Sequence, residues 1–383
     1  MILEYVSIRG YDVPVNKFNG SIMLIFPTIT RSEASRLIKR ALASTAVLGV
    51  LSAAPAWSLE NFQYVEPSSD FHFEADRFDV NPIIHREMHG MVGDTGRRDT
   101  GNNINGPSLI KVPDWIENPL GRYYLYFAHH HGGYIYLAYA DALEGPWKIH
   151  HGGVLPLETT PSYDGTPGDH VASPDVHVDH EERRIRMYYH AVPRPGTDYR
   201  YQASYVAVSE NGLDFDPLEE ILGLFYFRVF ERDGWHYALA KYINDGGVIY
   251  RSRDPLSGFE QGPRILPRVR HMALWEHDDM LYVFFSRGED EPEHIMVSRI
   301  ENLDDDWEDW RFTEPQTVLK PEKDYEGVDQ LIERSRFGAT YDFVHQLRDP
   351  AIYEEDGKLY LLYSAAGEWS IAIAELHFQE ERQ

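Results

Sequence analysis

The sequence predicts an all-β fold, a five-bladed β-propeller, and three observations lead to this prediction. One unit of three strands recurs five times between residues 105 and 383. Almost no segment of that region shows the 3.6-residue apolar period of an amphipathic helix. The composition is that of a globular chain, with 43% apolar and 13% aromatic residues. Radial repetition leaves few exposed sheet edges, whereas a β-sandwich would not explain five copies of the same hairpin.

The fifth unit is the clearest copy and defines the pattern. Its first strand is expected at residues 348–353, and its second strand, 358–364, follows the turn Asp356-Gly357. Its third strand is expected at 370–375. Asp-Gly between two alternating apolar runs is among the strongest short-range signals of a β-hairpin.

The other four units follow the same order of strand, turn, aromatic-rich strand and third strand. Their first strands are expected at 106–110, 173–178, 226–230 and 271–275, their second strands at 122–127, 185–190, 235–239 and 280–285, and their third strands at 134–138, 203–207, 248–250 and 294–298. The stretch 71–84, before the first unit, is in a position to close the ring.

The first 56 residues are predicted to be a signal peptide or other targeting segment. A basic stretch, 36–40, precedes the short apolar run 41–51, and Ala54-Pro55-Ala56 offers an A-x-A cleavage site. Met23 is a second candidate for the start, and a buried N-terminal helix is the structural alternative. An apolar run of this length is too short to span a bilayer comfortably.

The predicted organisation is therefore a targeting segment at 1–56, a lead-in and ring-closing stretch at 57–104, and a propeller domain at 105–383. We expect a monomer without a stable membrane anchor, in the periplasm or secreted. The net charge of −26 argues against nucleic-acid and anionic-membrane partners.

Several kinds of chemistry are excluded by residues that the chain lacks. It contains no cysteine, so disulfides, thiolate zinc sites and cysteine nucleophiles are absent. The motifs of P-loops, dinucleotide-binding turns, zincins and serine hydrolases are also missing. Adjacent strand residues point to opposite faces, so the triplet 129–131 of histidines is a poor metal site. We expect no cofactor and no catalytic metal, and leave open a structural calcium at the axis.

One opening of the propeller is predicted to collect polar side chains from all five units. The first strand of each blade is innermost, and its start lies at the same face as the end of the antiparallel second strand. First strands bring Asn105, Ser108, Ser173, Asp175, His177, Tyr226, Arg228, Arg270, His271, Arg348 and Asp349. The ends of second strands bring His129, His130, His131, His190, Lys241, Arg287, Ser364 and Glu368.

Basic groups outnumber carboxylates in this ring, although the chain has 62 Asp and Glu against 36 Lys and Arg. This excess predicts a pocket for an anionic substrate, such as a uronic acid or a sulfated sugar, held by arginine forks. The alternative is that the arginines bridge neighbouring blades by pairing with Asp and Glu.

Three phrases of the sequence carry a resemblance to a known family. They are 349–352 with 357–361, 139–143 before Gly145-Pro146-Trp147, and 173–176. Together with the repeat, over roughly residues 105–378, they resemble the five-bladed propeller glycoside hydrolases of families 43 and 32, as a divergent member. The resemblance implies cleavage or transfer at a glycosidic bond, where one carboxylic acid protonates the leaving oxygen and a carboxylate activates water or attacks.

The family's residues do not all carry over to this chain. Its first blade usually starts with an Asp before the proline, where this chain has Gly106, and blade three offers Tyr226 and Arg228 in place of the expected acid. The remaining candidates for catalysis are Asp175 and Asp349, with His271 as a positioned acid or base and Glu368 as a reserve acid. The substrate-binding candidates are Asn105, Ser108, His130, His177, His190, Tyr226, Arg228, Arg287 and Arg348.

The predicted function is an exported glycoside hydrolase that acts on an acidic or sulfated poly- or oligosaccharide. One alternative is a polysaccharide lyase that acts on uronic-acid glycans by β-elimination. It would use Arg228 or Arg348 as the cation, a histidine such as His130 or His271 as the base, and Tyr226 as the acid. The other alternative is a glycan-binding propeller without catalytic activity.

Overall fold

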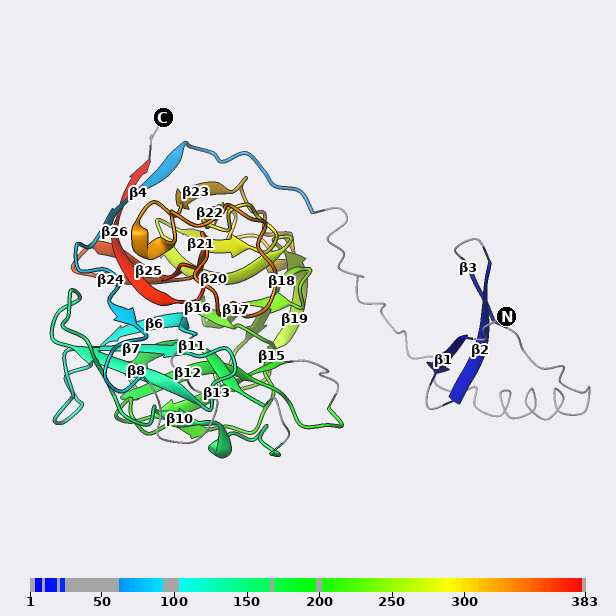
Figure 1. The fold of residues 1–383 in the computed structure, drawn as a ribbon, viewed down its shortest axis with the longest axis horizontal. Helices are drawn as coiled ribbons and strands as arrows, with labels where there is room; N and C mark the ends of the chain where they lie inside the picture. Colours follow the sequence, from blue (N-terminus) through cyan, green and yellow to red (C-terminus); the bar gives the residue numbers. More distant parts are fainter. Residues whose placement is uncertain are drawn as a thin grey trace, which may run out of the picture. The chain divides into compact units, whose positions relative to one another are not determined.

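Alternating apolar and aromatic residues form the strands, and the computed structural model arranges most of them as five sheets around one axis (Figure 1). The structure describes residues 4–8, 11–18, 21–24, 62–91, 103–165, 169–197 and 202–380. The chain divides into two units, Met1–Ala56 and Trp57–Gln383. The basic and apolar stretches expected to target the protein, 36–56, lie outside the described residues.

In the first unit, three strands form one antiparallel sheet. They are β1 (Glu4–Ile8), β2 (Tyr11–Phe18) and β3 (Ser21–Leu24), in the order β1-β2-β3. The candidate start Met23 pairs with Asn16 in this sheet.

The second unit is a five-bladed β-propeller, as the sequence predicts. Blade one contains β6 (Asn105–Lys111), β7 (Tyr123–Ala128), β8 (Tyr134–Ala140), β9 (Lys148–Ile149) and β10 (Leu155–Pro156), and blade two contains β11 (Val171–Asp179), β12 (Arg184–Ala191), β13 (Ala203–Ser209), β14 (Asp216–Pro217) and β15 (Gly223–Leu224). Blade three contains β16 (Arg228–Arg232), β17 (Trp235–Tyr242), β18 (Gly246–Ser252) and β19 (Glu260–Ile265), and blade four contains β20 (Val269–His277), β21 (Met280–Arg287), β22 (Ile295–Ile300) and β23 (Gln316–Leu319).

Blade five is completed by residues from before blade one. Its strands β24 (Leu347–Glu355), β25 (Lys358–Ala365) and β26 (Ser370–Glu380) are joined by β4 (Phe71–Arg77) and β5 (Ile84–His85), which both pair with β26. In Figure 1 the blue β4 lies beside the red β26. The two ends of the propeller sequence therefore close the ring within one sheet, which covers an edge that would otherwise be exposed.

Helix is sparse in the described part of the chain. It consists of three 3-10 turns, η2 (Leu157–Thr159), η3 (Trp307–Asp309) and η4 (Asp324–Glu326). None of the described helices is long and apolar enough to cross a membrane. Aromatic and aliphatic side chains fill the spaces between neighbouring blades, for example Phe73 of β4 against Trp275 and Phe284 of blade four.

Four of the five innermost strands have a bulge near their first residues, and this bulge shapes the axis. The pairing register slips by one residue between Asn105 and Ser108, Ala172 and Asp175, Val269 and Met272, and Arg348 and Ala351. Gly106, Ser173 and Asp349 have positive φ angles of 59°, 54° and 49° inside these bulges, and Tyr226, just before β16, has a φ of 69°. Bulges re-aim side chains, and here Ser173, Tyr226 and Asp349 line a cavity on the axis.

We expect Gly106→Ala to lower the free energy of unfolding by about 1–2 kcal/mol, because a left-handed backbone is strained for residues with a Cβ. A Cβ at this position would also lie 3.3 Å from the Cα of Ser173. Urea denaturation measures the loss. The matched control is Gly357→Ala, which has a φ of 74° but no atom within 4 Å of the added Cβ. Equal losses in both variants would contradict a role for the contact with Ser173.

Candidate functional site

A cavity on the propeller axis collects polar side chains from all five blades. It lies where the innermost strands start and the second strands end, and its lining residues are Asn105, His130, Ala172, Ser173, His190, Tyr226, Arg270, His271, Asp349 and Glu368. Seven of the predicted site residues therefore meet here, in the arrangement that the antiparallel blades dictate. The free volume is about 10 Å³, which is close to the space that one water requires.

Asp349 is a buried carboxyl group in this axial cavity, with only 2% of its surface exposed. The hydroxyl of Ser364 donates a hydrogen bond of 3.3 Å to its Oδ2, and Nδ1 of His271 lies 3.1 Å from its Oδ1. Burial, reinforced by the negative charge of Glu368, raises the pKa of Asp349 from 3.8 to about 6. Asp349 is therefore a carboxylic acid that can hold its proton in mildly acidic solution.

Glu368 is equally buried but is surrounded by hydrogen-bond donors. Nη1 of Arg348 lies 2.8 Å from Oε1, and Nδ2 of Asn103 and Nδ2 of Asn105 lie 2.5 and 3.3 Å from Oε2. Burial alone would raise the pKa of Glu368, but the imidazole of His130 at 3.5 Å, with Arg348 and Asn103, holds it well below its usual range. Glu368 is therefore a fixed negative charge at all ordinary pH values.

The environments of these two carboxyl groups thus push their pKa values in opposite directions. Such a pair supplies one proton donor and one permanently ionised group within the same site. This is the electrostatic arrangement that acid catalysis at a glycosidic oxygen requires.

Aromatic and imidazole rings form the other wall of the axial cavity. The ring centroid of Tyr226 lies 3.9 Å from that of His271 and 4.7 Å from that of His190. Burial, together with nearby cations, lowers the pKa of His271 and of His190 well below 6.5. Both imidazoles are therefore neutral at neutral pH and able to accept a proton. Burial raises the pKa of Tyr226, so its hydroxyl keeps its proton.

Two arginines near the axis, Arg270 and Arg348, form ion pairs within the protein. Nε of Arg270 lies 2.6 Å from Oε1 of Glu293, and Arg348 contacts both Glu293 and Glu368. Each of these side chains is at least 95% buried. The sequence left two alternatives for the predicted arginines, a guanidinium that is free to bind the substrate or one that pairs with a carboxylate of the protein. Arg348 pairs with glutamates of its own and of the neighbouring blade, so the first alternative is wrong for this residue.

Four of the predicted residues do not reach the opening. Ser108, Asp175, His177 and Arg228 line a second cavity of about 170 Å³, further along the innermost strands. The expected convergence of Asp175 with Asp349 is therefore wrong. The reason is the strand rise of about 3.3 Å per residue, which places side chains two and four residues past the first position progressively deeper along the axis.

Arg228 lines the second cavity and links three blades. Its Nε donates to the carbonyl oxygen of Met272 at 3.0 Å, and its Nη1 donates to those of Pro174 and Phe227 at 3.2 and 3.1 Å. These bonds tie blades two, three and four across the axis. In the same cavity, Nε2 of His177 lies 2.8 Å from Oδ2 of Asp175.

Arg287 lines neither axial cavity. Its Nε donates to Oδ2 of Asp290 at 3.0 Å, three residues along the chain, and its side chain is 26% exposed. Its place at the end of β21 suggested a position on the opening, but the local ion pair holds it elsewhere.

Sequence reasoning missed a segment that lies across the opening. We call residues 335–341 the strap. Backbone oxygens of Arg336 and Gly338 accept hydrogen bonds from Arg270, and the carbonyl of Thr340 accepts one of 2.9 Å from Nδ2 of Asn103. The strap belongs to the connection between blades four and five, which carries no repeat signal that would have placed it. It explains why the axial cavity is so small.

One buried residue near this opening escaped the sequence analysis. Glu293 is fully buried in the connection between β21 and β22, and no sequence pattern marks it. Lys241, at the end of β17, belongs to the ring that the sequence predicts, and it lies buried beside the lining residue Tyr226.

No group of three or more His, Asp or Glu side chains suited to a metal ion occurs among the residues that the structure describes. The histidines 129–131 are thus not assembled into a ligand set with their described neighbours.

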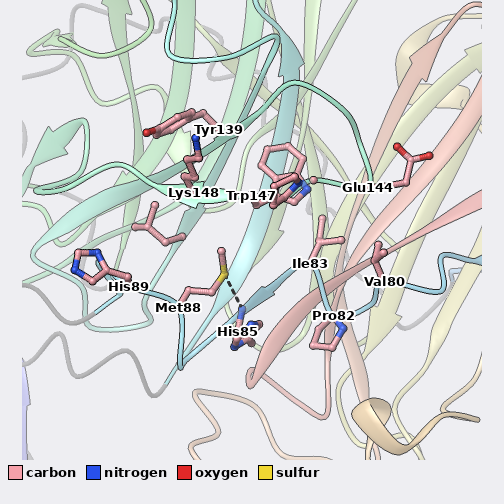
Figure 2. Close-up of a pocket in the computed structure, with 13 residues that line it drawn as sticks. Val80, Pro82, Ile83, His85, Met88, His89, Tyr139, Glu144, Trp147 and Lys148 are labelled. Atoms are coloured by element: carbon pink, nitrogen blue, oxygen red, sulfur yellow. Dashed lines mark hydrogen bonds between the residues drawn. The ribbon is translucent and has the colours of Figure 1, made fainter.

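A larger groove lies at the outer edge of the propeller, between the β5 region and blade one (Figure 2). Its volume is about 880 Å³, and Ile83, Met88 and Trp147 form part of its apolar wall. Glu144 is the single carboxylate among the described residues that line it. Because glycosidase chemistry needs two carboxyl groups in most families, the axial cavity is the better candidate for the active site.

Comparison with known proteins places the chain in a family. It is 33% identical over 331 residues to the uncharacterized protein R118 of Acanthamoeba polyphaga mimivirus, covering 78% of this chain and 89% of that protein. No protein-family profile matches the chain.

Solved structures share the fold at low sequence identity. An α-L-arabinofuranosidase from Lactobacillus brevis superposes with a TM-score of 0.52 at 13% identity, over 77% of this chain and 92% of that one. The GH43_1 enzyme of Xanthomonas citri superposes with a TM-score of 0.50 at 14% identity, over 71% and 87%. The chain therefore belongs to the family of the mimivirus protein and has the five-bladed propeller fold of the family-43 glycoside hydrolases.

Proposed function

We propose that this protein is a glycoside hydrolase whose active site is the axial cavity, with Asp349 as the general acid. The observation that carries the proposal is the pair of buried carboxyl groups, Asp349 and Glu368, whose pKa values are pushed apart by their surroundings. The fold shared with family-43 enzymes adds support at the level of architecture only.

In this mechanism Asp349 donates its proton to the leaving glycosidic oxygen. Glu368 stabilises the positive charge that develops on the sugar ring, since an ionised carboxylate lowers the energy of an oxocarbenium-like state. Its two oxygens already accept hydrogen bonds from Arg348, Asn103 and Asn105, which makes it a poor nucleophile. The neutral imidazole of His271, whose Nδ1 lies 3.1 Å from Oδ1 of Asp349, orients that acid. The neutral imidazole of His190, which also lines the cavity, is then the base that activates the attacking water.

Substrate binding requires displacement of the strap, because a sugar ring cannot enter a cavity of about 10 Å³. The outward side of the strap is exposed at Arg336 and Gly338, so its movement would disturb little of the core. We propose that the sugar replaces the strap's contacts at the opening when it binds.

The proposal includes an anionic substrate, an acidic or sulfated poly- or oligosaccharide, acted on by a monomer that is exported and has no membrane anchor. Since Arg270 and Arg348 are paired with glutamates, the support for an anionic substrate lies in Lys241, which has no such partner and is treated below. Mass spectrometry of the mature N-terminus, together with fractionation of the producing cell, tests export.

A lyase is the second candidate, and one observation favours it. Tyr226 keeps its proton, and its ring lies 3.9 Å from that of the neutral His271. Elimination in a uronic acid needs a base for the C5 proton, an acid for the leaving oxygen and a cation near the carboxylate. His271, Tyr226 and Lys241 could fill these three roles.

Digestion of a panel of glycans distinguishes these candidates. The panel contains alginate, ulvan, pectin and carrageenan with their oligosaccharides, and neutral arabinan and xylan. We expect reducing ends to appear without absorbance near 235 nm, because hydrolysis leaves no double bond. A rise in both signals would show that the protein is a lyase and not a hydrolase. Binding on a glycan array without any product would show that it is a glycan-binding protein without catalytic activity.

We also propose that the reaction needs no cofactor and no metal ion. Dialysis against EDTA is expected to leave the rate unchanged, because acid, base and charge stabilisation are all supplied by side chains. Recovery of a lost rate on addition of calcium would contradict this.

A further inference from the structure

Lys241 is a buried lysine beside the axial cavity, next to the lining residue Tyr226. It lies on β17 (Trp235–Tyr242), at the end of the second strand of blade three, and is 3% exposed. Its backbone N–H donates to the carbonyl of Phe225 at 2.9 Å, which fixes the start of its side chain. None of the steps proposed above for hydrolysis uses it.

The surroundings of its ammonium group are aromatic. Nζ lies 4.8 Å from the ring centroid of Phe337 in the strap, 5.5 Å from that of Tyr226 and 5.7 Å from that of Phe225. No described carboxylate forms an ion pair with it, although buried Arg270 and Arg348 nearby each have one. A buried cation without a counter-ion is costly, and cation–π contacts offset only part of that cost.

The charges around Lys241 make its protonation sensitive to a bound anion. Burial, and then the charge of Arg270, lowers the pKa of Lys241 to about 7. The titratable and charged groups that face it are Tyr226, Arg270, Glu293, Arg348 and Asp349, with His190 and His271 across the cavity. A bound anion would supply the counter-ion that the ammonium group of Lys241 lacks among the described residues.

We infer that Lys241 is a specificity-determining residue that binds a negatively charged substituent of the sugar, the carboxylate of a uronic acid or a sulfate ester. The inference rests on the proposed function, since it assumes that the axial cavity receives the glycan. It assigns the anion preference to one unpaired ammonium group rather than to the arginines, and it locates the charged substituent beside Tyr226 and the strap.

The test is calorimetric titration of monosaccharides, which have no glycosidic bond to cleave, into the Asp349→Asn variant, in which the group that ionises near pH 6 is absent. The probes are glucuronate, glucose 6-sulfate and glucose. At pH 6 we expect at least one of the two anions to bind at least tenfold more tightly than glucose. Raising the pH to 8 should weaken that binding about tenfold, as the ammonium group loses its proton. A preference confined to glucuronate identifies the carboxylate, and one confined to glucose 6-sulfate identifies the sulfate ester.

Lys241→Met, and Lys241→Gln as a second variant, should abolish the preference for anions without abolishing the binding of glucose. Lys320→Met, an exposed lysine away from the axis, is the matched control and should change nothing. Anion binding that is unchanged in both Lys241 variants, or equal affinity for glucose and for the anions in the parent, would overturn the inference.

The outcomes separate this inference from the proposed function. If only the neutral glycans of the panel are cleaved, the proposed role of Lys241 is refuted, whereas the proposed hydrolase function is supported. Lys241-dependent binding of an anion, with no glycan cleaved, would support the role of Lys241 and refute the hydrolase.

Discussion

Replacement of Asp349 by Asn is expected to lower kcat/KM about 10²- to 10⁴-fold, the usual contribution of a positioned general acid. Asn keeps the volume of the side chain but has no proton to donate. The measurement is the initial rate of reducing-end release on the best substrate of the panel, together with the binding constant of a product sugar. A loss of rate with binding retained identifies a group that acts in the transition state.

The pH dependence of the parent enzyme gives an independent test of this role. Since Asp349 must be protonated to act as the acid, and its pKa is about 6, kcat/KM should fall as the pH rises above about 6. Asp349→Asn should lose that basic limb. A residual rate in the variant with the same basic limb would assign the limb to another group.

The same substitution should stabilise the fold at neutral pH. A carboxyl group whose pKa is raised in the folded state contributes stability that is fully present below the unfolded pKa of 3.8 and is lost as the pH rises through about 6. The shift corresponds to up to about 3 kcal/mol. Asp349→Asn should therefore raise the free energy of unfolding at pH 7.5 and have little effect at pH 4, as measured by urea denaturation.

Asp175→Asn distinguishes the structural assignment from the sequence-based one. Asp175 lines the second cavity, together with Arg228, and is bound to His177. We expect a far smaller loss of rate than in Asp349→Asn. A loss of equal size would mean that the catalytic groups extend through the axis.

Glu368→Gln is expected to destabilise the protein by about 3–5 kcal/mol, the usual cost of breaking a buried ion pair on one side. The substitution removes the negative charge opposite Arg348, whose side chain is 2% exposed. It also turns an acceptor into an amide that cannot accept from both Arg348 and Asn103. Activity should be lost as well, because the fixed charge beside Asp349 disappears.

Urea denaturation at pH 7.5 measures the loss of stability, and circular dichroism of the folded baseline confirms that the sheets are retained. Glu375→Gln is the matched control, since Glu375 pairs with Lys358 on the surface with that lysine 55% exposed. Such surface pairs contribute about 0–1 kcal/mol. A loss below about 1 kcal/mol in Glu368→Gln would show that Glu293, which Arg348 already contacts at 3.4 Å, is a sufficient counter-ion by itself.

The repeat pattern predicted the arrangement of the blades because strand pairing is local in sequence. Hairpins such as 348–353 with 358–364 are visible as alternating apolar runs around a turn, and they became β24 and β25. The same local rule placed Asp349, His271 and Glu368 at one opening. It failed for Asp175, because alternation shows which residues face the axis but not how deep each one lies.

The partners of the charged residues were beyond prediction from sequence. The sequence left open whether Arg348 is a free cation or is paired with a carboxylate, and Glu293 and Glu368, from other segments, both contact it. The strap is a further case, because it is held by backbone carbonyls that any residue could supply. By itself the sequence determined the all-β propeller, the number of blades and the ring of polar residues, since these follow from local periodicity. Only the tertiary structure decided which charges are paired, how deep each side chain lies and that Lys241 is left without a carboxylate, because those depend on distances between segments far apart in the chain.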